Sequence, residues 1–83
     1  MALFMDSHAI EGGVKASDVA NAHQLDVQTE EKYGVRYLRY WVDEKEGKIF
    51  CLVDAPDAET ANQVHREAHG LVAQSIYPVI EGA

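Results

Sequence analysis

The sequence predicts an α+β fold in which strands and helices follow one another in the order β-α-β-β-α-β. Two stretches with helical apolar spacing are bounded by capping residues and glycines. Four shorter stretches are predicted to be strands, of which the one over 35–42 is rich in β-branched and aromatic residues, and a polar segment ending in glycine joins the middle two as a hairpin. Residues 1–83 are expected to form one domain, because a chain of this length has no room for a second core.

The first half of the chain is predicted to fold as a strand, a helix and a second strand. Residues 2–8 form the first strand, and the glycine pair at 12–13 marks the turn after it. Ser17 is a favourable N-cap for a helix that runs to about Tyr33 and stops at Gly34, since glycine readily ends helices. The apolar stripe of this helix is predicted to consist of Val19, Ala20, Ala22 and Val27, with His23 inside it.

A hairpin, a second helix and a last strand are predicted for the second half of the chain. The expected ranges are a strand over 35–42, a loop over 43–47, a strand over 48–54 and a final strand over 74–80. Asp57 or Asp54 caps the helix between the last two strands, and Gly70 ends it. Pro78 has no backbone N–H to donate to a ladder, so the last strand belongs at a sheet edge.

This order of elements is typical of ferredoxin-like folds. Right-handed crossovers place both helices on one face of a four-stranded antiparallel sheet whose first and third strands are central. The strand over 35–42, however, is apolar on both sides, and a strand with one wet face should alternate. Its predicted faces are Val35, Tyr37 and Trp41 on one side and Leu38, Tyr40 and Val42 on the other. We therefore expect a homodimer in which the sheets of two copies pack against each other.

Charge and composition limit the possible partners. The formal net charge of −7 would repel phosphate backbones, so no nucleic-acid partner is expected. No apolar stretch approaches the ~18 residues of a membrane span, so no membrane partner is expected. A single cysteine, Cys51, cannot pair within the chain, and no signal peptide is visible. Both observations favour a reducing, cytoplasmic location.

Side chains that bind divalent metals are frequent for so small a chain. The candidate ligands are Asp6, His8, His23, Cys51, His65 and His69. On a helix, the spacing of His65 and His69 puts both imidazoles on one face, where they could share an ion. The topology also predicts that His23 and His65 face each other across the two helices. Metal affinity is expected to fall below about pH 6, because ligating imidazoles must be neutral.

Each candidate also has a structural interpretation. His23 in an apolar stripe can be a half-buried histidine bonded to a backbone carbonyl, and Cys51 can be a small core residue. Asp6 is harder to explain, because carboxylates avoid the middle of a central strand unless they are paired. His8, Arg36 or a metal ion would each supply the partner that Asp6 needs.

Four segments of the chain carry a resemblance to a known family. They are the segments FMDSH at 4–8, YW at 40–41, FCLVDAP at 50–56 and HREAHG at 65–70. With them the chain resembles, over nearly its whole length, a family of small bacterial domains of unknown function typified by a nickel-binding protein. The resemblance implies a ferredoxin-like homodimer that binds divalent nickel near the dimer surface, for sequestration or sensing. The histidines in the matching segments are His8, His65 and His69.

An enzyme is the competing interpretation. Ferredoxin-like dimers with a cavity against the sheet also serve as small monooxygenases and isomerases. Asp6 and His8, two apart on one strand face, could act there as acid and base on a small organic substrate. The chain has no Ser-His-Asp order, phosphate-binding loop, dinucleotide fingerprint or Cys-x-x-Cys pair. The sequence therefore favours a metal-binding protein, with nickel first and copper or zinc as alternatives.

Overall fold

The computed structural model describes residues 2–83 and has the predicted order of elements. They are strand β1 (Ala2–Ala9), helix α1 (Ala16–Thr29), the short 3-10 helix η1 (Glu30–Tyr33), strands β2 (Arg36–Asp43) and β3 (Lys48–Ala55), helix α2 (Ala58–Ala68) and strand β4 (Ser75–Pro78). Gly34, with a φ of 67°, ends the first helical segment as predicted. The strands form an antiparallel sheet in the order β2-β3-β1-β4, so the first and third strands are central and β4 is an edge, as predicted.

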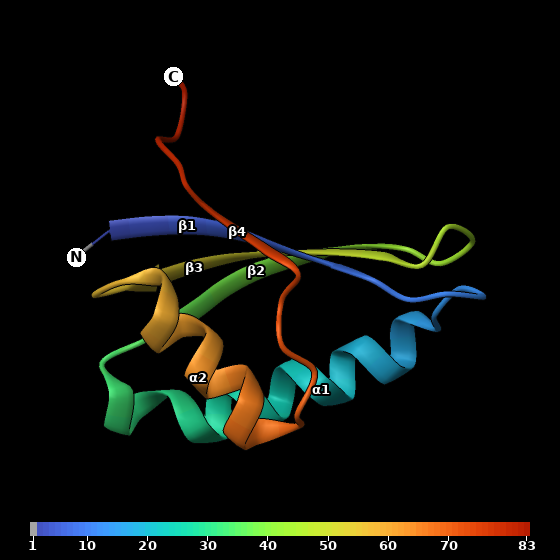
Figure 1. The fold of residues 1–83 in the computed structure, drawn as a ribbon, viewed down its shortest axis with the longest axis horizontal. Coiled ribbons are helices and arrows are strands. Elements are labelled where there is room, and N and C mark those ends of the chain that lie inside the picture. The colour runs from blue at the N-terminus through green and yellow to red at the C-terminus, as the bar shows by residue number, and fades with distance from the viewer. Residues whose placement is uncertain (1) are drawn as a thin grey trace.

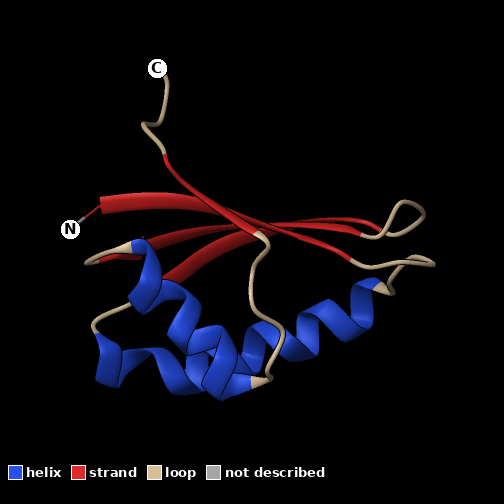
Figure 2. Ribbon diagram, viewed as in Figure 1, coloured by secondary structure: helices blue, strands red, loops and turns tan. Residues whose placement is uncertain are grey.

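The fold has two layers. Both helices lie on one face of the sheet, and the chain after β4 leaves toward the opposite, open face (Figures 1 and 2). The core between the layers is built mainly from Phe4, Val19, Val35, Tyr37, Ile49, Val53, Ala55, Ala61 and Val64. Within residues 2–83, no helix is long and apolar enough to cross a membrane.

The two helices are capped in different ways. Asp57 caps α2 as predicted, since its carboxylate accepts the Thr60 N–H at 2.7 Å. The prediction of Ser17 as the cap of α1 is wrong, because that helix already begins at Ala16. The carboxylate of Glu44, in the loop between β2 and β3, accepts the Ala16 N–H at 2.8 Å. A hydrogen bond from a residue far away in the chain therefore satisfies the first backbone N–H of α1, whereas the residue directly before α2 caps that helix.

A β-bulge interrupts the pairing of β2 with β3. Tyr37 pairs with Val53, but the next pair along the ladder is Arg39 with Leu52. Leu38 is thus an extra residue on β2 without a counterpart on β3. Because side chains alternate along a strand, one extra residue reverses the faces of everything that follows it.

The bulge corrects the predicted faces of β2. Tyr40 and Val42 lie on the helix side with Tyr37 and pack against the core, whereas they were assigned to the opposite face. Leu38 and Trp41 lie on the open side, where they are 42% and 47% exposed. The apolar character on both sides of this strand therefore has two sources. One is that the bulge reverses which side chains face the helices, and the other is that the open face of the sheet is itself apolar.

Candidate metal centre

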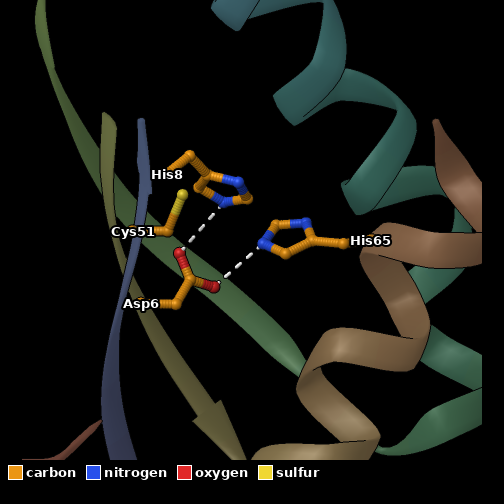
Figure 3. Close-up of side chains that lie close together, drawn as sticks. All are labelled: Asp6, His8, Cys51 and His65. Atoms are coloured by element: carbon orange, nitrogen blue, oxygen red, sulfur yellow. Dashed lines mark hydrogen bonds and ion pairs between the residues drawn. The ribbon is translucent and has the colours of Figure 1, made fainter. Parts of the chain in front are cut away.

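Side chains of metal-ligand type from β1, β3 and α2 meet between the sheet and the helices (Figure 3). Asp6 and His8 both point to the helix side of β1, because residues two apart on a strand share a face. Cys51 is the register partner of Asp6 on β3, and His65 reaches the same point from α2. All four are buried, and one potential ligand atom from each lies within 4.8 Å of the others.

Two carboxylates hold the ring of His65. Its Nε2 lies 2.9 Å from Oδ2 of Asp6, and its Nδ1 lies 3.0 Å from Oδ1 of Asp26. Since both ring nitrogens face carboxylate oxygens, both donate, and His65 is an imidazolium. Burial alone would lower the pKa of His65, but the hydrogen bonds with Asp26 and Asp6, together with their charges, outweigh burial and raise the pKa to about 9.

The two carboxylates are ionised. Burial opposes ionisation of Asp6 and Asp26, but the hydrogen bond of each with His65 and the closeness of a second histidine to each lower the pKa of both carboxyls. The second histidine is His8 for Asp6 and His69 for Asp26. Two carboxylates and one imidazolium leave this buried network with a net negative charge. Such a charge favours the binding of a cation.

Tyr37 and Cys51 remain protonated beside Asp6. The Tyr37 hydroxyl lies 2.9 Å from the carbonyl oxygen of Ala61 and 3.2 Å from Oδ2 of Asp6. Burial and the charge of Asp6 raise the pKa of the Tyr37 hydroxyl and of the Cys51 thiol well above their ordinary values. Cys51 must therefore lose a proton before its sulfur can bind a metal as thiolate.

His69 extends the network toward the surface. Its Nδ1 accepts the Leu71 N–H at 3.1 Å, so its hydrogen is on Nε2, which lies 3.1 Å from Oδ1 of Asp26. The ring centroids of His65 and His69 are 5.1 Å apart. The two imidazoles thus lie close together as their spacing predicted, but they share a carboxylate, and His65 is buried. Asp26, His65 and His69 form a second group whose ligand atoms lie within 4.8 Å.

Asp26 is the member of the network that the sequence analysis did not identify. It lies on α1 two turns after Val19, on the same face, and is 3% exposed. Val27, which was assigned to the apolar stripe, is 43% exposed. The spacing from Val19 is the sequence signal that marks Asp26 as inward-facing. Asp26, rather than His23, meets His65 across the two helices.

Two buried polar atoms at the centre, Oδ1 of Asp6 and Nδ1 of His8, have no hydrogen-bond partner among residues 2–83. Nε2 of His8 lies 3.3 Å from Oδ1 of Asp6, within ion-pair range but without hydrogen-bond geometry. Histidines, and not the exposed Arg36, are therefore the partners of Asp6. A buried polar atom without a partner is destabilising by roughly 1–3 kcal/mol. A ligand that bound these atoms would recover part of that free energy.

A partly open cavity of about 110 Å³ lies beside the centre, between the sheet and α1. His8 lines this cavity, whereas Asp6 is not part of its wall. His23 also lines it, with its ring centroid 4.8 Å from that of Tyr40. Within the part of the chain that the structure describes, His23 belongs to neither of the two ligand groups.

Comparison with known proteins identifies the family. A family profile described as nickel responsive protein SCO4226-like matches residues 4–79. The chain belongs to the SCO4226-like family. The crystal structure of SCO4226 from Streptomyces coelicolor A3(2) superposes with a TM-score of 0.91 at 35% sequence identity, covering 99% of this chain and 100% of that one. The comparison confirms the resemblance and the ferredoxin-like fold inferred from the sequence. A search of curated proteins gave no match.

The stability of this SCO4226-like protein without metal should depend on pH through His65. The folded pKa of about 9 lies above the ordinary value of 6.5. The contribution of His65 to folding is therefore complete below pH 6.5 and is lost as the pH rises through 9. The difference corresponds to about 3 kcal/mol. We expect the free energy of unfolding in urea to fall by this amount between these two pH values.

The lowered pKa values of Asp6 and Asp26 act in a different pH range. Their contribution is present above the unfolded value of 3.8 and is lost only as the pH falls further, so it does not change in the alkaline range. The matched control is His65→Gln, whose free energy of unfolding should not decline in the same way between pH 6.5 and 9. A wild-type protein that is equally stable at both pH values would contradict the assignment of His65 as an imidazolium.

Proposed function

We propose that this protein binds divalent nickel at the group formed by Asp6, His8, Cys51 and His65. Oδ1 of Asp6 carries the proposal, because it is a buried carboxylate oxygen beside an imidazole and has no hydrogen-bond partner among residues 2–83. A cation there would supply the partner and offset the negative charge of the network. Oxygen, nitrogen and sulfur donors together suit nickel, zinc and copper, and the family description favours nickel.

Binding at this group would exchange protons for the ion. Without metal, His65 is an imidazolium and Cys51 a thiol, so each must lose a proton to become a ligand. An ion bound by Asp6 and His65 would also alter the 2.9 Å contact that joins α2 to β1. Occupancy would therefore change how α2 packs on the sheet, which suits a sensing role, while burial of the ion suits sequestration.

Calorimetric titration of the metal-free protein with nickel, copper, zinc and cobalt salts tests the proposal, and two variants locate the site. His8→Ala removes a ligand that belongs only to the proposed group, and His69→Ala removes one that belongs only to the group with Asp26. We expect His8→Ala to lower nickel affinity by at least about 100-fold, as loss of a ligand should. His69→Ala should lower it by about tenfold or less, because residues that bond directly to ligands contribute about 10–100-fold and His69 touches only Asp26, one step further out.

His65→Ala should lower nickel affinity most, because His65 belongs to both groups. Adding His69→Ala to His65→Ala should then have little further effect. The opposite order, with His69→Ala more damaging than His8→Ala, would place the ion with Asp26. Affinity no stronger than millimolar for any of the four metals would contradict the proposed function.

We also propose that the protein is a homodimer joined through the open face of the sheet. The apolar side chains that line a groove on that face are Leu3, Met5, Leu38, Trp41, Leu52, Val79 and Ile80. Trp41 and Leu38 are 47% and 42% exposed, although an antiparallel sheet with one solvated face normally presents polar residues there. Contiguous exposed apolar side chains mark interaction sites. A two-fold copy of the same face is the simplest cover.

Trp41→Glu should convert the dimer to a monomer, because a charge left without a partner in an interface is destabilising by about 3–5 kcal/mol. Light scattering at micromolar concentration should give twice the mass of one chain for the wild type and the mass of one chain for the variant. Lys45→Glu, an exposed charge change in the β2–β3 loop, is the control and should remain dimeric. A monomeric wild type would contradict the proposed assembly.

The enzyme interpretation has less support. It requires Asp6 and His8 together at the mouth of a substrate cavity, but Asp6 is fully buried and does not line the cavity. The cavity of about 110 Å³ is also smaller than the ~300–1,000 Å³ pockets that enclose drug-sized ligands, so it has no room for a substrate of that size. Metal binding needs no such pocket, and it makes direct use of Asp6.

A further inference from the structure

The cavity beside the metal centre has apolar walls. They are formed by Val14, Val19 and Ala22 from the α1 side, Ile49 from β3 and Leu71 from the segment after α2. Almost the whole lining surface is apolar, and the cavity is partly open to solvent. An engineered apolar cavity of ~150 Å³ holds benzene. In proportion, about 110 Å³ holds roughly four or five non-hydrogen atoms, and the open mouth leaves space for the remainder of a six-membered ring.

One polar side chain reaches the cavity without a partner for one of its atoms. His8 lines the cavity, is 3% exposed, and its Nδ1 has no hydrogen-bond partner among residues 2–83. In Figure 3 this nitrogen lies on the edge of the ring that is turned away from Asp6, toward α1. Nε2 of the same ring faces Asp6 at 3.3 Å. The ring therefore has one edge at the metal centre and the other toward the cavity.

We propose that this cavity binds a small neutral molecule with an apolar body and a single hydroxyl group, of the size of phenol. The hydroxyl would pair with Nδ1 of His8. A hydroxyl suits this position because it both donates and accepts, so it can pair with either tautomer of the ring. An anionic ligand is disfavoured, because the carboxylates of Asp18 and Asp26 outnumber the single imidazolium of His65 among the lining residues and the chain carries a net charge of −7.

The cavity adjoins the proposed metal centre, since His8, Cys51 and His65 also line it, but its ligand would use a different edge of the His8 ring. Its ligand contacts Nδ1 of His8, whereas the proposed ion uses the edge that faces Asp6. No metal is needed to form the cavity walls. Ligand binding can therefore be measured on the metal-free protein, and nickel binding can be measured independently on the same variants.

NMR titration of the metal-free protein with phenol, toluene and benzoate tests the proposal. Phenol should bind saturably and about fivefold more tightly than toluene, the difference expected for one net hydrogen bond. Benzoate should bind more weakly than either. Ala22→Leu fills the cavity and should weaken phenol binding by at least about tenfold. Asn21→Leu, an exposed change on the same helix, should leave phenol affinity unchanged.

Leu71→Trp is a second filling variant, at a position that is 40% exposed and tolerant of a larger side chain. The dispersion of the NMR spectra recorded in the same titrations shows whether both filling variants are folded, whatever their affinity for phenol or nickel. Absence of saturable phenol binding by the wild type, or wild-type affinity in both filling variants, would overturn the site. Equal affinities for phenol and toluene would overturn the role of His8, and preferred binding of benzoate would overturn the requirement for a neutral ligand.

Discussion

Asp6→Asn should lower the free energy of unfolding of the metal-free protein by about 3–5 kcal/mol at neutral pH. The substitution keeps the shape of the side chain but leaves the imidazolium of His65 with one carboxylate instead of two, in a site where His65 is 1% exposed. Breaking a buried ion pair by removing one partner has an effect of this size. Since native domains are stable by only about 5–15 kcal/mol, the variant should be close to unfolding. Urea denaturation followed by circular dichroism gives the difference.

A matched variant and a double mutant separate the ion pair from general destabilisation. Glu11→Gln makes the same chemical change at an exposed turn and should alter stability by less than about 0.5 kcal/mol. Asp6→Asn combined with His65→Gln should be little worse than the worse single variant, because both changes remove one interaction. If Asp6→Asn were no more damaging than Glu11→Gln, the charged pairing of Asp6 with His65 would be wrong.

The topology could be predicted because each element carries its own local signal. Gly34 stops the first helical segment, Asp57 caps α2, and Pro78 restricts β4 to an edge, and all three act within a few residues of where they stand. The start of α1 could not be predicted in this way. Its first N–H is bonded by Glu44, 28 residues away in the chain, a contact that exists only in the folded protein.

The bulge in β2 was missed for a different physical reason. No glycine or proline marks Leu38, and the strand on both sides of it consists of residues that favour strands. Without the bulge, the alternation predicted Tyr40 on the face opposite Tyr37, although its ring lies on the helix side near His23. A pattern of period two cannot reveal a single inserted residue when both faces of the strand are apolar.

Part of the candidate metal centre could be predicted, because the sequence places a charged residue at a position that must be buried. Asp6 was identified because a carboxylate in a central strand must have a partner, and the structure supplies His65 and His8. Asp26 was missed because carboxylates on helices normally face solvent. Its burial follows from the packing of α1 against α2, which brings His65 to within 3.0 Å of it.

Nickel affinity should rise steeply with pH through the range in which His65 loses its proton. Each proton that the ion displaces makes affinity change about tenfold per pH unit. With the pKa of His65 at about 9, release of this one proton predicts a rise of roughly 50-fold between pH 7 and pH 9, where the ring is already half deprotonated. An unperturbed imidazole would predict a fall in affinity only below about pH 6, as the sequence alone suggested. The carboxylates of Asp26 and Asp6 raise the pKa of His65 and so move the rise in nickel affinity to alkaline pH.

Cys51 decides whether one proton or two are released when nickel binds. Burial and the charge of Asp6 raise the pKa of its thiol, so a sulfur ligand would add a second proton and bring the rise between pH 7 and pH 9 to roughly 5,000-fold. Calorimetry in buffers of different ionisation enthalpy counts these protons directly. Cys51→Ser should lower the count by one if the sulfur binds and should leave it unchanged if Cys51 is only a core residue. Affinity that stays constant between pH 7 and pH 9 would exclude both His65 and Cys51 as ligands.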